Sequence, residues 1–113
     1  MYRIVHSDNQ RKGALAAVAF EGHAHGSEVS FFVGDLPPGK GPALHKHPYS
    51  ETCIVRSGEA AMNVDCEDVT ARAGDVVVIG ADTPHRFVAS GDERLDMVCI
   101  HASDEFVIEW LGE

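Results

Sequence analysis

Short β-prone segments separated by Gly, Pro and Asp recur along almost the whole chain, and this pattern constrains the fold more than any other feature. Many short strands with regular breaks are typical of an all-β sandwich or barrel. Helical periodicity is almost absent before residue 103. We therefore predict strands over residues 3–5, 15–20, 28–36, 43–47, 51–57, 59–64, 69–72, 75–79, 85–89 and 94–101.

The last ten residues depart from this pattern and predict a short C-terminal helix over residues 103–112. Ser103 is a good helix cap, and the two acidic residues that follow it suit a first helical turn. The apolar residues Phe106, Val107, Trp110 and Leu111 would then share one face. We expect this helix to pack on the barrel, with Trp110 as a packing residue.

Length and charge limit the classes of function. The 113 residues suit one domain (residues 1–113, with a barrel at about 28–102), and the net charge of -9 disfavours nucleic acid as a partner. No apolar stretch approaches the ~20 residues of a membrane span, and the N-terminus lacks the pattern of a secretory signal. We expect a cytoplasmic protein. Its cysteines, Cys53, Cys66 and Cys99, lack metal-ribbon spacing and are interpreted as buried free thiols.

One group of residues points to chemistry. His45 and His47 are separated by one residue, so a strand sends both imidazoles to the same face. Pro48 then breaks the strand, and Glu51 opens the next one near the same interior space. His85 opens a later strand after the rigid Thr83-Pro84 turn. Imidazole and carboxylate ligands together suit one divalent ion of Mn, Fe, Co, Ni, Cu or Zn, without identifying it.

These residues also resemble the first motif of the cupin superfamily. That motif reads Gly, five residues, His-x-His, three or four residues, Glu, six residues, Gly. The matching residues are Gly39, His45, His47, Glu51 and Gly58. The resemblance implies a double-stranded β-helix, the jelly-roll barrel of small single-domain cupins, and implies that His45, His47, Glu51 and His85 are metal ligands.

The second cupin motif is matched only in part. It reads Gly, five residues, Pro, x, Gly, two residues, His, three residues, Asn. Gly74 and His85 agree with it, whereas Gly80, Asp82 and Ala89 replace the Pro, Gly and Asn. These departures concern the shape of the turn more than the metal ligands.

Strand alternation predicts what surrounds the metal. Cys53 and Val55 share the face of Glu51, and Phe87 shares the face of His85, so these residues are predicted to line the cavity. Met97, Cys99 and His101 share one face of the last strand, but Val98 and Ile100 on the other face are equally apolar, so alternation alone leaves the inward face open. We include Met97 and Cys99 among the expected cavity-lining residues. The cations Lys46, Arg56 and Arg86 fall on outward positions. A small neutral or weakly polar ligand is therefore favoured over a strongly anionic one.

His101 and Tyr49 are the candidate catalytic residues. His101 is a general base or a donor to a ligand if its face is internal, and a surface residue if it is not. Tyr49 either contributes its hydroxyl to the cavity mouth or simply covers a turn. A second His-x-His, at His23 and His25, lacks a following carboxylate and is interpreted as a surface loop.

The resemblance leaves several functions open. Cupins include metal-dependent dioxygenases, isomerases and lyases that act on small organic molecules, and the ligand set fits each of them. The alternative is a binding or sensing module whose metal is structural, and the fold alone does not separate the two. The resemblance also implies a homodimer, because cupins commonly pair through sheet edges.

Overall fold

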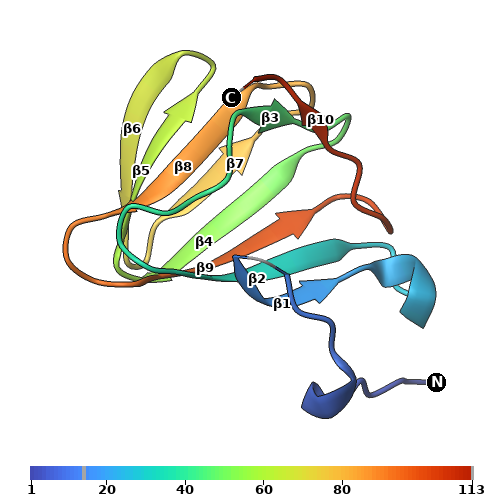
Figure 1. The fold of residues 1–113 in the computed structure, drawn as a ribbon. Helices are drawn as coiled ribbons and strands as arrows, with labels where there is room; N and C mark the ends of the chain where they lie inside the picture. Colours follow the sequence, from blue (N-terminus) through green and yellow to red (C-terminus); the bar gives the residue numbers. More distant parts are fainter. Residues whose placement is uncertain (14, 113) are drawn as a thin grey trace.

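The computed structural model describes residues 1–13 and 15–112, and its strands form two five-stranded sheets (Figure 1). One sheet has the order β1-β2-β9-β4-β7 and the other β10-β3-β8-β5-β6. The strands are β1 (Ala16–Phe20), β2 (Ser30–Leu36), β3 (His45–Lys46), β4 (Glu51–Ser57), β5 (Glu59–Val64), β6 (Glu67–Arg72), β7 (Val76–Ile79), β8 (His85–Ser90), β9 (Leu95–His101) and β10 (Glu109–Trp110). The predicted all-β architecture of two layers is confirmed.

The predicted strand bounds agree with the structure on both sides of the glycine turn at Gly58. β4 and β5 have the predicted bounds, and Gly58 joins them with a φ of 81°. A Cβ atom at this position would lie 2.4 Å from the carbonyl oxygen of Arg94, so only glycine fits the turn. The strand predicted over residues 3–5 is wrong, because in the described chain this segment lies outside both sheets and pairs with no neighbouring strand.

The core lies between the sheets and follows strict alternation. Along β9 every second side chain is buried, from Leu95 through Met97 and Cys99 to His101. β4 alternates in the same way, and the two strands pair in antiparallel register. The inward face of the last long strand, which the sequence left open, is therefore the one that carries His101.

The helix predicted over residues 103–112 is wrong. The Ser103 hydroxyl does accept the Glu105 backbone N–H, as a cap would, but no helix follows it among the described residues. The segment instead runs extended across the mouth of the barrel and ends in β10, which pairs with β3. Its backbone N–H groups bond to distant partners: Phe106 to Glu21, Val107 to Tyr49 and Leu111 to Leu44. These tertiary bonds replace the ones that a helix would form.

No helix among the described residues has the length and apolarity needed to cross a membrane.

Part of the outer face of the sheet that contains β4 is largely apolar across four neighbouring strands, beside a charged row that includes Asp35 and Asp96. Two registered rows of side chains cross it from β2 to β7: Phe31, Ile100, Thr52 and Val78, and Val33, Val98, Ile54 and Val76. Val76 and Val78, on the edge strand, are 59% and 69% exposed. A continuous apolar sheet face of this kind is typical of a surface that pairs with another protein surface.

We propose that two copies of the chain associate through this outer face. The rows carry no charge, so two acidic chains can meet there without opposing their carboxylates. Val78→Lys should dissociate the dimer, because burying an unpaired ammonium group costs several kcal/mol. Light scattering coupled to gel filtration should give twice the 12.2 kDa chain mass for the parent protein and the chain mass for the variant. Val88→Lys, on the outer face of the other sheet, is the control; a monomeric parent protein would contradict the proposal.

Candidate metal centre

Four buried side chains from both sheets meet at one end of the barrel interior. His45 lies on β3, His47 directly after it, and His85 is the first residue of β8, where it pairs in register with His45. Glu51 is the first residue of β4 in the opposite sheet. One donor atom from each of the four lies within 4.8 Å of the others. The structure thus brings together the four side chains whose meeting was predicted from the His-x-His spacing and from the positions of the strand starts.

Hydrogen bonds fix which nitrogen of each imidazole faces the centre. The Nδ1–H groups of His45, His47 and His85 donate to the carbonyl oxygens of Ala43, Val107 and Thr83, at 2.7, 2.8 and 2.8 Å. A carbonyl oxygen can only accept, so each Nδ1 carries the hydrogen and each neutral ring leaves a lone pair on Nε2. This is the arrangement that histidine ligands of metal ions have in proteins.

The Nε2 atoms face a carboxylate that also offers only lone pairs. Those of His47 and His85 each lie 3.1 Å from Oε1 of Glu51. His47 Nε2 is buried and has no hydrogen-bond partner. Acceptors gathered this closely in a buried site require a cation or a proton between them.

The pKa shifts of Glu51 and His85 also indicate that a positive charge is needed inside the cluster. Burial alone would raise the pKa of Glu51, but the imidazoles of His47, His85 and His101 around the carboxylate outweigh it and hold the pKa well below its usual range. Burial would lower the pKa of His85, yet its bonds to Glu51 and to the Thr83 carbonyl raise it above 6.5. In the ion-free protein a proton shared with Glu51 therefore occupies the place of a cation. Three neutral imidazoles and one carboxylate suit a divalent metal ion of the first transition series.

His101, the candidate base, is buried beside the cluster in a different tautomer. Tyr49 accepts the Val107 backbone N–H at 3.2 Å, and its hydroxyl lies 2.6 Å from Nδ1 of His101. The hydroxyl proton is best placed as a donor to Nδ1, which leaves the hydrogen of His101 on Nε2. That nitrogen lies 3.6 Å from Oε2 of Glu51. Burial lowers the pKa of His101 to about 4, so the ring is neutral at pH 7.

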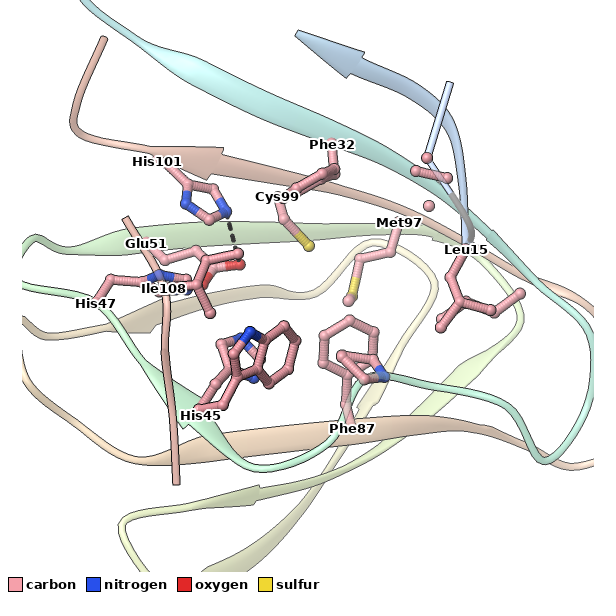
Figure 2. A pocket seen from close by; sticks show the side chains of 16 residues that line it. Leu15, Phe32, His45, His47, Glu51, Phe87, Met97, Cys99, His101 and Ile108 are labelled. Atoms are coloured by element: carbon pink, nitrogen blue, oxygen red, sulfur yellow. Dashed lines mark ion pairs between the residues drawn. The ribbon is translucent and has the colours of Figure 1, made fainter. Parts of the chain in front are cut away.

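An apolar pocket of about 190 Å³ opens onto the cluster. Figure 2 shows His45, His47, Glu51 and His101 at one end, and Leu15, Phe87 and Met97 at the other. No Lys or Arg lines it in the part of the chain that the structure describes, and the predicted outward positions of Arg56 and Arg86 are exposed. Lys46 pairs with Glu109 on the outside, at 3.7 Å.

The predicted lining is partly correct. Phe87, Met97 and Cys99 line the cavity, whereas Cys53 and Val55 point inward but are covered by other core residues. Sequence reasoning missed several lining residues: Leu15, Phe32, Leu36, Ile108 and Trp110. Alternation along the strand at 30–36 offered a signal for two of them, Phe32 and Leu36. Ile108 and Trp110 had no such signal, because they reach the cavity only through the extended C-terminal segment.

The second His-x-His lies away from the cluster, as predicted, because His23 is exposed and His25 stacks on Phe20.

Cys66 is exposed, which corrects its predicted burial; it lies in the β5–β6 turn with a φ of 67°. Asp82, which stands where the second cupin motif has glycine, adopts a φ of 59° and donates its N–H to the His47 carbonyl at 2.7 Å. Asp tolerates this left-handed conformation, so the turn keeps its shape.

Comparison with known proteins is consistent with this architecture. Among solved structures, the oxalate decarboxylase of Lactobacillus farciminis, in a formate complex, superposes with a TM-score of 0.81 at 21% identity, over 94% of this chain and 35% of that one. A protein of Klebsiella pneumoniae with a double-stranded β-helix domain gives 0.75 at 24% identity, over 96% and 90%. The oxalate decarboxylase of Bacillus subtilis, described with Mn(II) centres, gives 0.74 at 25% identity, over 83% and 27%.

Two curated relatives are more similar in sequence but longer. The chain is 38% identical over 64 residues to "Polyketide synthase CurC" of Streptomyces cyaneus, which covers 56% of this chain and 42% of the relative. It is 31% identical over 75 residues to "Uncharacterized protein MJ1618" of Methanocaldococcus jannaschii, which covers 66% and 60%. The chain thus spans less than two thirds of either relative. The cupin domain family matches residues 32–101, from β2 to the end of β9, and this chain belongs to that family.

Proposed function

We propose that this protein is a metal-dependent enzyme that acts on a small, uncharged and largely apolar organic molecule. The observation that carries the proposal is the set of Nε2 lone pairs and one carboxylate at the end of an apolar pocket. A purely structural ion would gain nothing from facing a cavity of this size. His45, His47, Glu51 and His85 would hold the ion.

When bound, the ion would supply Lewis-acid polarisation of a substrate oxygen or, with a redox metal, electron transfer to dioxygen. Mn²⁺ is the first ion to test, because the Bacillus subtilis relative in fold contains Mn(II) centres.

The cavity walls favour a particular substrate chemistry. Their side chains are mainly aliphatic and aromatic, and a volume of about 190 Å³ suits a molecule somewhat larger than benzene. A dianion such as oxalate would find no side-chain cation among the described lining residues. The similarity to CurC supports a substrate with carbonyl or hydroxyl oxygens, since polyketides carry both.

Tyr49 and His101 would place a proton beside the reacting oxygen. The Tyr49 hydroxyl bonds to Nδ1 of His101, and the opposite ring nitrogen presents its hydrogen to the cluster side of the cavity. That hydrogen can bond to, or pass to, a substrate oxygen, and the Tyr49 proton can replace it through the ring. Packing of His101 against Phe32 and Phe106 keeps this ring in place.

Removing one ligand should remove the ion. We expect the parent protein, purified without chelators, to carry one equivalent of metal. The His47→Ala variant should bind Mn²⁺ more than about a hundredfold more weakly, because loss of a residue that merely hydrogen-bonds to a metal ligand already lowers metal affinity about 10–100-fold. Elemental analysis and calorimetric titration measure both quantities. His23→Ala, in the exposed His-x-His, is the matched control. Equal trace metal in all three proteins would contradict the assignment.

Mn²⁺ binding should weaken as the pH falls. Because the pKa of His85 is raised in the ion-free protein, its proton competes with the cation. Below that pKa the apparent affinity should fall about tenfold per pH unit for each proton displaced. The folding stability of the ion-free protein should depend on pH in the opposite direction. The stability that protonated His85 contributes is fully present below pH 6.5 and is lost as the pH rises through the raised pKa of His85. Calorimetry from pH 5 to 8 tests the first expectation, and an affinity independent of pH would contradict it.

His101→Gln should lower turnover by about 10²–10⁴-fold at unchanged metal content, because it removes the positioned proton donor. Tyr49→Phe should lower it less, since the ring of His101 remains. The assay is a screen of small neutral carbonyl and enol compounds with the Mn²⁺-loaded protein. Full activity in His101→Gln would exclude the proton-transfer role. Tight binding of such compounds without any turnover by the parent protein would instead favour a binding module.

A further inference from the structure

Two cysteines lie side by side beneath the metal cluster. Cys53 on β4 and Cys99 on β9 are register partners, with 0% and 5% of their surface exposed. Both are free thiols. Directly opposed residues on antiparallel strands have Cβ atoms about 4.5–5.5 Å apart, so the two sulfur atoms need only small rotations to face a common point.

Glu51 supplies a third donor to this pair. Its Oε2 atom lies 3.4 Å from Sγ of Cys53, and one donor atom each from Glu51, Cys53 and Cys99 lies within 4.8 Å of the others. Its Oε1 atom faces His47 and His85 instead. The two oxygens of one carboxylate are therefore directed at two different sets of ligand-type groups.

The separations suit a tetrahedral ion. Metal–sulfur bonds of about 2.3 Å and metal–oxygen bonds of about 2.1 Å at a tetrahedral angle place sulfur and oxygen about 3.6 Å apart. The hydrogen bond that the Cys53 thiol donates to Glu51 Oε2 has a length of 3.4 Å, so an ion that replaces the thiol proton requires little movement of either atom. An ion can reach the group from the cavity, because Glu51 and Cys99 both line it and Figure 2 shows the Cys99 sulfur turned toward it.

We propose that Glu51, Cys53 and Cys99 form a second cation site, specific for a thiophilic divalent ion such as Zn²⁺ or Cd²⁺, with Glu51 shared between this site and the histidine cluster. Thiolate ligands select such ions over Mg²⁺, Ca²⁺ or Mn²⁺, whereas the histidine cluster accepts a wider range. The second site shares Glu51 with the proposed metal centre but has a spectroscopic signature of its own.

Cadmium titration tests the site directly. The protein is studied as Cys66→Ser, which removes the one exposed thiol, and is kept reduced with a phosphine. We expect two equivalents of Cd²⁺ to bind, one of them producing the ultraviolet thiolate-to-cadmium charge-transfer band. Cys99→Ala and Cys53→Ala in this background should each bind one equivalent and lose most of the band. Circular dichroism checks that each variant is folded, and Cys99→Ala alone suffices if Cys53→Ala does not fold.

A ligand variant of the other cluster separates the two sites. His47→Ala should lose the equivalent without the band and keep the equivalent with it, so failure of the proposed histidine site leaves this test intact. Absence of the band in the reduced Cys66→Ser protein would overturn the proposal, and would mean that the two thiols only fill the core. So would a band that persists at full intensity in the folded Cys99→Ala variant.

Discussion

The buried carboxylate of Glu51 is the group on which the centre of this structure depends. A charged oxygen taken out of water is unfavourable by several kcal/mol unless it is paired and hydrogen-bonded. Here it faces the Nε2 atoms of His47 and His85 at 3.1 Å. Because each Nδ1–H is already committed to a carbonyl oxygen, the imidazoles have no further hydrogen to give in their neutral form. The cluster is therefore balanced only when a proton or a cation lies inside it.

Backbone carbonyl groups around the cluster accept the Nδ1–H bonds and so fix the orientation of the three imidazole rings. For His45 and His85 the accepting carbonyl lies two residues earlier, at Ala43 and Thr83, so the turn that precedes each strand sets the ring orientation. For His47 it lies at Val107, sixty positions away. The C-terminal segment thus orients a ligand, walls the cavity with Ile108 and Trp110, and places its Val107 N–H on Tyr49.

The pocket is lined partly by segments that lie outside the region matched by the family. His45, His47, Glu51 and His85 lie within the matched region 32–101, whereas the pocket is also lined by residues outside it, among them Leu15 and Ile108. Apolar side chains from both ends of the chain line this pocket, and apolar surroundings strengthen the electrostatic interactions at its inner end. The described lining residues include no Lys or Arg.

The sequence by itself determined the all-β class, the succession of strands between residues 16 and 101, and the meeting of His45, His47, Glu51 and His85. These follow from local rules: alternation along a strand, breaks at Gly and Pro, and a motif whose spacing is contained within short segments. It also left His101 undecided, because both faces of residues 95–101 are apolar and periodicity has no preference between them. The helix predicted over residues 103–112 was wrong because a local pattern could not settle the structure there either. Its cap residue and its amphipathic spacing are real local signals, but they carry no information about distant partners.

Only the tertiary structure decided those points. The segment gains more from β3, Tyr49 and Glu21 than from its own helical bonds, because these distant partners satisfy its backbone while its apolar side chains close the cavity. His101 turns inward because pairing of β9 between β2 and β4 commits Leu95, Met97 and Cys99 to the core, and strand geometry carries His101 with them. Long-range pairing is invisible to a local pattern, and it is what completes this centre.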